Sequence, residues 1–324
     1  MEKVSALVKD FKVPATKSWY YLELNNGTSI PCIGLGSGTK TMKWHYQKPF
    51  GLSLPGRALN KVYNKLYDSY KCKQVVKSFG NALDYGYRLI DYSSAYGRGQ
   101  LISKAILNRG IPREQLFLTS RVSNKQQFSK TVRDGFFSTI KDLGVDYLDL
   151  YLFHWPVTDC FVDTYKEMEK LYKEGYVKAL GVCNCHQHHL QAIFDECEVI
   201  PAINQFEVHP LFTQKPLIGF CKEHGIQVMA YTPLARNDDR LHSNLILKAL
   251  CKKYNKNLGQ IILRWDIQQG IIPIPRSSNP MRQASNIDIF DFELTEDEMI
   301  AIDSININSR LRYDPDNLDF HSIG

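Results

Sequence analysis

An acid and a phenol lie five residues apart in the segment RLIDYSSAYG, residues 88–97. Leu89 and Ile90 favour a buried strand that ends at Asp91, and a short loop then presents Tyr96. A tyrosine has an ordinary pKa of about 10, and a nearby cation lowers the pKa of a phenol. The segment therefore indicates acid–base chemistry in a pocket at the end of a strand, with a cation supplied by another part of the chain.

The composition is that of an ordinary globular protein, with 324 residues, 44% hydrophobic and 23% charged. The first residues lack the apolar core of a signal peptide, and no run approaches the ~18 apolar residues that span a bilayer. The net charge of +6 is mild and forms no basic block. We therefore expect an anionic small ligand, with no nucleic-acid and no membrane partner.

Eight cysteines are scattered along the chain, several of them inside apolar stretches. This pattern predicts reduced, packed thiols and hence a cytoplasmic protein.

Short apolar stretches alternate with amphipathic helical stretches along most of the chain. Such alternation is typical of parallel strands that are connected by helices. The expected strands number eight and span 30–36, 88–93, 116–121, 147–155, 178–183, 202–208, 227–234 and 271–277. Eight such units in about 300 residues favour a closed (β/α)8 TIM barrel over a doubly wound sheet. We therefore expect residues 19–324 to form one barrel domain.

Four further segments flank or interrupt this barrel. Residues 1–18 are expected to be an N-terminal extension, and Asn25-Asn26-Gly27 predicts the turn of a β-hairpin. An insertion over residues 39–73 follows the first barrel strand, and part of it, residues 58–70, could be a short helix. The irregular C-terminal tail from residue 309 onward is expected to fold as a loop over the barrel mouth.

Polar side chains follow nearly every expected strand. In a barrel of this type the C-terminal ends of the strands meet at one mouth, where active sites lie. The residues placed there are Gly36, Ser37, Asp91, Tyr96, Arg121, His154, Trp155, Cys183, Asn184, Gln205, Tyr231, Thr232, Arg276, Ser277 and Ser278. Stability alone does not require an acid, a phenol, a cation and an imidazole at one mouth, so the set predicts catalysis.

The chain resembles the aldo-keto reductase family from about Leu22 to Phe320. The motifs that carry the resemblance are LNNGTSIPCIGLG, RLIDYSSAYG, GIPREQLFLTS, DYLDLYLFHWP, KALGVCN, INQFEVHP, AYTPLA and IPIPRSSNPMRQASN. Together they are far more specific than any one alone. The resemblance implies a (β/α)8 barrel that reduces aldehyde or ketone carbonyls with NADPH and without a metal. Many barrels of this kind are monomers, and we expect the same here.

The resemblance also implies a catalytic set of Asp, Tyr, Lys and His. Asp91, Tyr96 and His154 match three of its members, and Arg121 stands where the family has Lys. An arginine keeps the positive charge and can bind Asp91 through two hydrogen bonds, but it cannot give up a proton. Tyr96 would then donate the proton, and Trp155 would form a wall of the substrate pocket. Trp44 could close over the substrate or simply pack in its loop.

Cofactor contacts follow from the same resemblance. Asn184 and Gln205 would bind the nicotinamide amide, and Cys183 stands where the family commonly has Ser. Arg276 replaces the usual Lys and would bind a 2′-phosphate together with Arg282, which favours NADPH over NADH. The full set of implied cofactor contacts is Gly36, Ser37, Cys183, Asn184, Gln205, Tyr231, Thr232, Leu234, Arg276, Ser277, Ser278, Arg282 and Asn286.

Several other interpretations of single residues stay open. Asp91 could pair with Arg88, and His154 could be a packed core histidine. The run CNCHQHH, residues 183–189, contains metal-ligand residue types, but its spacing matches no standard zinc pattern, and we expect no metal. Residues 236–240 could clasp the cofactor or form a solvated loop.

Two other functions also fit the sequence. The chain could bind NADPH as a regulatory or redox-sensing module with little turnover because of Arg121. A non-redox barrel enzyme, such as an isomerase, is disfavoured by the Arg276, Arg282 and Asn286 set.

Overall fold

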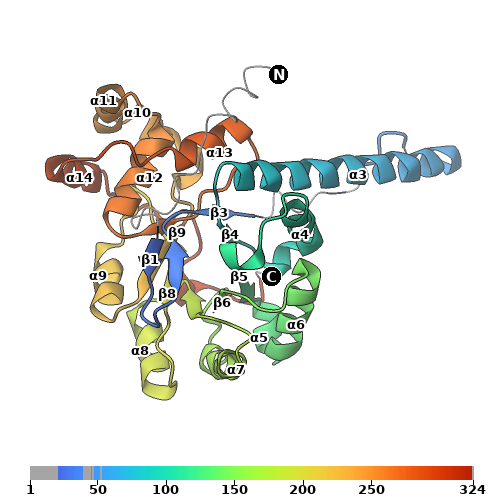
Figure 1. Ribbon diagram of the computed structural model, residues 1–324, viewed down its shortest axis with the longest axis horizontal. Helices are drawn as coiled ribbons and strands as arrows, with labels where there is room; N and C mark the ends of the chain where they lie inside the picture. The colour runs from blue at the N-terminus through green and yellow to red at the C-terminus, as the bar shows by residue number, and fades with distance from the viewer. Residues whose placement is uncertain (1–20, 39–44, 46, 52, 323–324) are drawn as a thin grey trace.

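The predicted barrel is confirmed. The computed structural model describes residues 21–38, 45, 47–51 and 53–322. Its main sheet has eight parallel strands, and each pairs with the next one along the chain. These strands are β3 (Gly34–Gly36), β4 (Leu89–Asp91), β5 (Phe117–Val122), β6 (Leu150–Phe153), β7 (Leu180–Cys183), β8 (Ile203–Glu207), β9 (Gln227–Tyr231) and β10 (Ile272–Pro273). Figure 1 shows the helices arranged around them.

The first and last strands meet where the barrel closes. The backbone N–H of Gly36 donates to the carbonyl oxygen of Pro275 across 3.2 Å. A Cβ atom at position 36 would lie only 2.9 Å from the carbonyl oxygen of Ile274. The glycine therefore allows the two backbones to approach closely enough for closure.

A β-hairpin lies at the opposite end of the barrel from the mouth. Strands β1 (Tyr21–Glu23) and β2 (Ser29–Pro31) pair antiparallel around the predicted turn. The Asn26 side-chain amide donates to the carbonyl oxygen of Lys178 across 2.9 Å, just before β7 begins. The strand expected over 30–36 is therefore divided, because its first residues pair within the hairpin and only Gly34–Gly36 enters the barrel.

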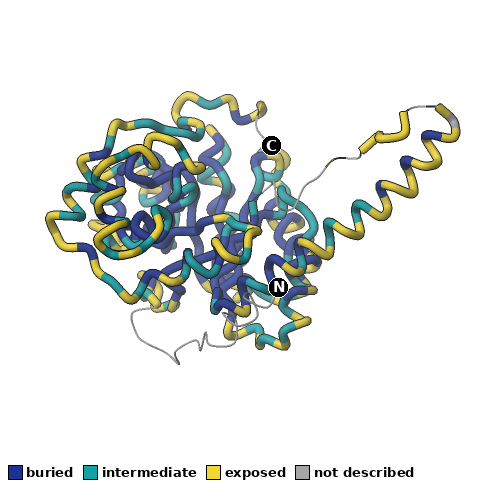
Figure 2. The backbone as a smooth tube through the Cα atoms, turned by 90° about the horizontal axis from the view of Figure 1, so that it is seen from above, coloured by how far each residue is buried: buried dark blue, intermediate teal, exposed yellow. Residues whose placement is uncertain are grey.

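Helices cover the outside of the sheet. In Figure 2 the buried parts of the chain lie at the centre of the barrel. They are α3 (Leu54–Asp84), α4 (Gly99–Leu107), α5 (Asn124–Phe128), α6 (Val132–Leu143), α7 (Phe161–Lys173), α8 (Gln187–Glu196), α9 (Lys215–Glu223), α10 (Asp239–Ser243), α11 (Leu245–Tyr254), α12 (Leu258–Gln268), α13 (Pro280–Ile287) and α14 (Glu296–Asp303). One apolar cluster fills the barrel interior and a larger one lies between strands and helices.

Helix α3 corrects the interpretation of the insertion. A short helix over 58–70 was expected to be separate from the next helix, but one continuous 31-residue helix spans Leu54–Asp84. Pro55 lies in its first turn, and no glycine or proline interrupts residues 57–79, so nothing in the sequence breaks the helix. The first part of α3 extends beyond the barrel in both views (Figures 1 and 2).

Three further expectations concern the cysteines, the segments that flank the barrel and bilayer-spanning helices. All eight cysteines are free thiols. The N-terminal extension over 1–18 and the start of the insertion lie outside the described residues. Among the described residues, no helix is both long enough and apolar enough to span a bilayer.

Candidate active site

A cavity of about 940 Å³ opens at the C-terminal ends of the strands. The cavity is lined by most of the residues that the sequence predicted for the mouth or for the cofactor site. They are Gly36, Asp91, Tyr96, Arg121, His154, Trp155, Asn184, Gln205, Tyr231, Thr232, Leu234, Arg276, Ser277, Ser278, Arg282 and Asn286. The mouth is therefore one continuous site that combines the proposed catalytic and cofactor residues.

A buried polar cluster forms the deep end of the cavity. Arg121 on β5 forms an ion pair with Asp91, and its second guanidinium nitrogen donates to Gln205 Oε1 across 2.8 Å. Asp91 Oδ1 also accepts hydrogen bonds from Thr119 Oγ1 at 2.8 Å and from Gln205 Nε2 at 3.1 Å. Burial opposes the charge of Arg121, but Asp91 raises the pKa of the guanidinium, so this cation is permanent.

This cluster changes two sequence-based interpretations. Arg88 donates instead to the carbonyl oxygens of Leu83 and Tyr87, so the Asp91–Arg88 pair does not form. Both amide atoms of Gln205 bond to Asp91 and Arg121. Gln205 thus supports the ion pair, and this geometry does not favour its expected contact with a nicotinamide amide.

The phenol of Tyr96 lines the cavity from the 3-10 turn Ser94–Tyr96 that follows β4. Burial raises its pKa above the ordinary value, and Asp91 adds to this increase, while Arg121 acts in the opposite direction. Arg121 therefore acts in the expected direction, but burial outweighs it. Tyr96 keeps its proton at neutral pH and is available as a hydrogen-bond donor.

His154 follows β6 and is also one of the residues that line the cavity. Burial, together with the nearby cations Arg121 and Arg312, lowers its pKa to about 3. The imidazole is therefore neutral at physiological pH and carries a single N–H.

Aromatic side chains border the cavity beside His154. Trp155 is buried, and its ring centroid lies 6.2 Å from the ring of His154 and 6.3 Å from that of Tyr313 in the tail. Trp155 therefore has the position expected of a substrate wall. The other tryptophan proposed for the substrate, Trp44, lies outside the described residues.

The middle of the cavity is held by bonds between neighbouring strand ends. Tyr231 donates its hydroxyl to Asn184 Oδ1 across 2.6 Å, and Asn184 Nδ2 donates to the carbonyl oxygen of His154 across 2.9 Å. Thr232 follows with φ of +54°, a left-handed conformation that is rare for a β-branched residue. Strained backbone of this kind is common at functional sites.

Two predicted cofactor residues do not reach the cavity. Ser37 is buried, and its hydroxyl has no hydrogen-bond partner among the described residues. Cys183 is fully buried inside the barrel, where burial raises the pKa of its thiol to about 12. The cavity wall is therefore formed without these two side chains, and their contacts with a cofactor stay a prediction.

The outer end of the cavity is cationic. Arg276 and Arg282 are exposed at its rim, and neither guanidinium has a carboxylate partner among the described residues. Asn286 is buried beside them on α13, a helix that begins at Pro280 after the N-cap residue Asn279. Two such guanidinium groups near a helix N-terminus suit a phosphate group, so this end fits the phosphates of NADPH.

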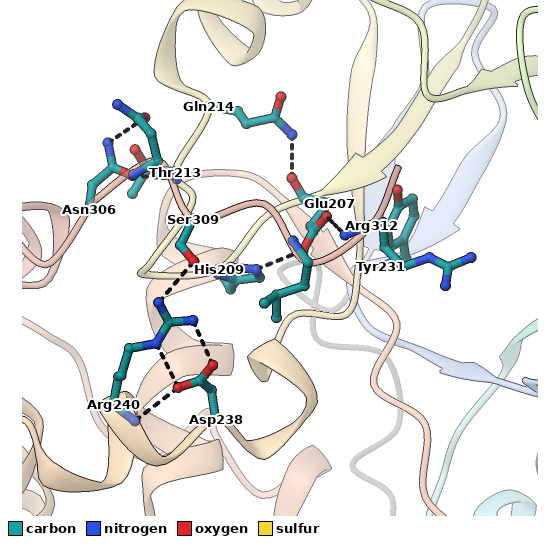
Figure 3. Close-up of polar contacts among 12 residues, drawn as sticks. Glu207, His209, Thr213, Gln214, Tyr231, Asp238, Arg240, Asn306, Ser309 and Arg312 are labelled. Atoms are coloured by element: carbon teal, nitrogen blue, oxygen red, sulfur yellow. Dashed lines mark hydrogen bonds and ion pairs between the residues drawn. The ribbon is translucent and has the colours of Figure 1, made fainter. Parts of the chain in front are cut away.

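The C-terminal tail closes one side of the mouth, as expected. The buried carboxylate of Glu207, at the end of β8, accepts the backbone N–H groups of Leu311 and Arg312, each across 2.9 Å. It also bonds to His209 Nε2 at 2.9 Å, and Figure 3 shows the tail held by these contacts. Arg312 and Tyr313 consequently line the cavity.

Sequence reasoning did not identify Glu207, Arg312 or Tyr313. The expected tail over the mouth was the available signal, but the sequence does not show which tail residue meets which strand. Arg236 and Asn237 also line the cavity, so the start of the segment 236–240 belongs to the site.

The histidines of the CNCHQHH run contact the tail. Asp316 lies 2.8 Å from His186 Nδ1, 3.3 Å from His188 Nε2 and 3.8 Å from His189 Nε2. The backbone N–H of His186 donates to His189 Nδ1, so the proton of that ring is on Nε2, the atom that faces Asp316. These groups connect α8 to the tail.

The chain belongs to the aldo/keto reductase family, whose model matches residues 63–307. It is therefore an NADPH-dependent oxidoreductase that reduces aldehyde or ketone carbonyls. The glyoxal reductase of Bacillus subtilis is 41% identical over 299 residues, which cover 92% of this chain and 97% of that relative. The methylglyoxal reductase of Escherichia coli is 39% identical over 246 residues, with coverage of 75% and 89%.

Solved structures show the same fold. An aldo-keto reductase from a deep-sea metagenome matches with a TM-score of 0.79 and 34% identity, covering 92% of this chain and 99% of that one. An aldo-keto reductase from Bombyx mori, solved in complex with NADP, matches with a TM-score of 0.76 and 33% identity, covering 91% and 95%.

Proposed function

We propose that this reductase acts on small aldehydes and dicarbonyls of the glyoxal and methylglyoxal type, with Tyr96 as the proton donor. One observation carries the proposal. Tyr96 and His154 line the same cavity as the two cations Arg276 and Arg282 at its outer end. The names of the two relatives described above suggest the substrate class.

NADPH, when bound, supplies the hydride that reduces the carbonyl carbon. The chain's own residues act on the carbonyl oxygen, which gains negative charge in that step. His154 and Tyr96 both donate hydrogen bonds to this oxygen, and fixed donors of this kind stabilise developing charge. Tyr96 then transfers its proton to the oxygen. An alkoxide is a much stronger base than a phenolate, so a phenol with a raised pKa still gives up its proton in this step.

Arg121 has an electrostatic role in the proposal. It stands where the family Lys is expected, and its charge lowers the energy of the phenolate that forms on Tyr96. Asp91 and Gln205 hold the guanidinium in place. We therefore propose that the ion pair works without proton relay, because arginine does not release a proton.

Cofactor binding is divided along the cavity. Tyr231 would stack on the nicotinamide ring and Asn184 would bind its amide. Thr232, Leu234, Ser277 and Ser278 would contact the ribose and pyrophosphate. Arg276, Arg282 and Asn286 would bind the adenosine end with its 2′-phosphate. We further propose a single-domain cytoplasmic enzyme that acts as a monomer on small molecules.

The test is NADPH oxidation with a panel of glyoxal, methylglyoxal, simple aldehydes, ketones and keto sugars, together with a direct NADPH titration. We expect steady turnover with the dicarbonyls. A wild type that binds NADPH but is inactive on every carbonyl, while Arg121→Lys gains activity, would instead support the NADPH-binding module.

A further inference from the structure

The first part of helix α3 carries an apolar stripe whose side chains are largely exposed. We define the arm as residues 54–73, about 30 Å of helix at 1.5 Å per residue. It extends away from the barrel in both views (Figures 1 and 2). The later part of α3 packs on the barrel through Val75, Phe79 and Leu83. The arm itself therefore contributes little to the barrel core.

The stripe follows the helical repeat. Leu59, Val62, Leu66 and Tyr70 are 53%, 61%, 67% and 58% exposed, and Tyr63 lies between them. The spacing i, i+3, i+4, i+7 and i+11 places these side chains on one face of the helix. Large apolar side chains gathered on one exposed face indicate an interaction surface.

Another side of the arm is already occupied. Asn64 Oδ1 accepts the N–H of Gln47 at 2.7 Å, and Asn60 Oδ1 accepts that of Phe50 at 3.1 Å. The loop 47–51 is thus fixed against the arm, and the ring of Phe50 packs against Tyr63 with centroids 6.1 Å apart. Phe50 is itself 48% exposed and extends the apolar surface at the end of the arm.

The charges of the arm identify the kind of partner. Its basic residues are Arg57, Lys61, Lys65, Lys71 and Lys73, and its one acidic residue is Asp68. Asp68 forms an ion pair with Arg98, which lies outside the arm. A helix with an apolar face that includes tyrosines and a strongly basic remainder is typical of peptides that lie in the surface of an anionic bilayer.

We propose that the arm docks this enzyme on an anionic lipid surface, with the apolar stripe in the headgroup region. A second copy is a poorer partner, because the two basic arms would repel each other. The prediction of no membrane partner rested on the lack of a spanning segment, and surface binding does not need one. None of the residues that line the active-site cavity belongs to the arm, so docking is separate from the reaction.

The test is co-sedimentation of the full chain with vesicles of phosphatidylcholine, with and without phosphatidylserine. We expect binding only to the anionic vesicles, and we expect it to weaken as salt is added. Leu59→Ser together with Leu66→Ser leaves the charge unchanged and should weaken binding by about tenfold. Leu245→Ser, on α11, is the matched control, because Leu245 is 79% exposed and lies outside the arm.

Charge is tested separately with Lys61→Glu together with Lys65→Glu, against Lys252→Glu on α11 as control. All variants should reduce carbonyls at the wild-type rate, which shows that the barrel is folded and separates this test from that of the proposed function. Two results would overturn the proposal. One is no binding to anionic vesicles at low salt. The other is a dimer in light scattering that salt strengthens and the serine variants abolish.

Discussion

The two ends of the active-site cavity are built in opposite ways. At the deep end, Asp91, Arg121 and Gln205 are buried and bonded to one another. At the outer end, Arg276 and Arg282 are exposed and have no carboxylate partner among the described residues. A fixed network suits a step in which charge develops within the protein, because its dipoles need no reorganisation. Unpaired surface cations suit a phosphate that arrives with the cofactor.

Breaking the deep ion pair should have the largest effect on stability. Arg121→Met leaves Asp91 buried without a cation, which typically costs about 3–5 kcal/mol of the free energy of unfolding. Urea denaturation measures this loss. Arg121→Lys keeps the charge but has a single nitrogen, whereas the guanidinium bonds to Asp91 and Gln205 through two nitrogens. We therefore expect it to lower the free energy of unfolding by about 1 kcal/mol, the value of one hydrogen bond.

The exposed pair Arg133–Glu174 provides the control for that experiment. Arg133→Met should change stability little, because water and salt screen an exposed pair. An Arg121→Met variant as stable as Arg133→Met would contradict the assignment of a tightly coupled deep network.

The buried His154 should make stability depend on pH. Its pKa is about 3 in the folded protein and about 6.5 when unfolded, so below pH 6.5 the unfolded chain binds more protons. Stability is therefore fully present above pH 6.5 and is lost as the pH falls toward 3. Between pH 7 and pH 5 the loss should be about 2 kcal/mol.

His154→Gln is the comparison for this pH effect, because it removes the titrating group and keeps a hydrogen-bond donor. Urea denaturation at pH 7 and pH 5 should show a smaller loss in His154→Gln than in the wild type. Equal losses in the two proteins would mean that His154 is not held neutral by burial.

Changing the outer end should affect cofactor binding and leave the fold intact. Arg282→Ala should raise the Kd for NADPH by about tenfold, or about 1.4 kcal/mol, through the loss of one charged contact to phosphate. The Kd for NADH, which lacks the 2′-phosphate, should stay unchanged. Fluorescence titration with both cofactors checks this, and an equal change in both would place Arg282 away from the 2′-phosphate.

The tail should have the smallest effect. Glu207→Gln replaces a carboxylate that accepts two backbone N–H groups with an amide that has one acceptor oxygen. The tail would then hold Arg312 and Tyr313 less firmly, and we expect KM for the carbonyl to rise about fivefold with kcat nearly unchanged. A fall in kcat with constant KM would show that Glu207 acts on the chemical step.

The local patterns in the sequence predicted much of this structure. The strand that ends at Asp91 and the turn that presents Tyr96 depend on neighbouring residues, so both were predicted correctly. The length of α3 was not predicted, because the basic and aromatic composition of residues 39–73 suggested a loop although no residue breaks the helix after Pro55. Local propensity was the better guide there.

Long-range contacts could not be predicted from the sequence. Gln205 was assigned to the cofactor, and only the folded barrel shows that Arg121 reaches it from three strands away. Likewise, the contact of Glu207 with Leu311 and Arg312 joins residues more than a hundred positions apart. The raised pKa of Tyr96 depends on its burial, which the sequence does not specify.

We assign proton donation to the deep end of the cavity and cofactor binding to its outer end. This assignment is tested most directly with Tyr96→Phe, which removes one hydroxyl at the deep end. NADPH affinity by fluorescence titration and kcat with methylglyoxal are measured on the same preparation. We predict that the Kd for NADPH stays within about twofold while kcat falls by about 10²–10⁴-fold, the usual contribution of a proton donor. A variant that turns over at the wild-type rate would contradict the account, because the proton would then come from another group.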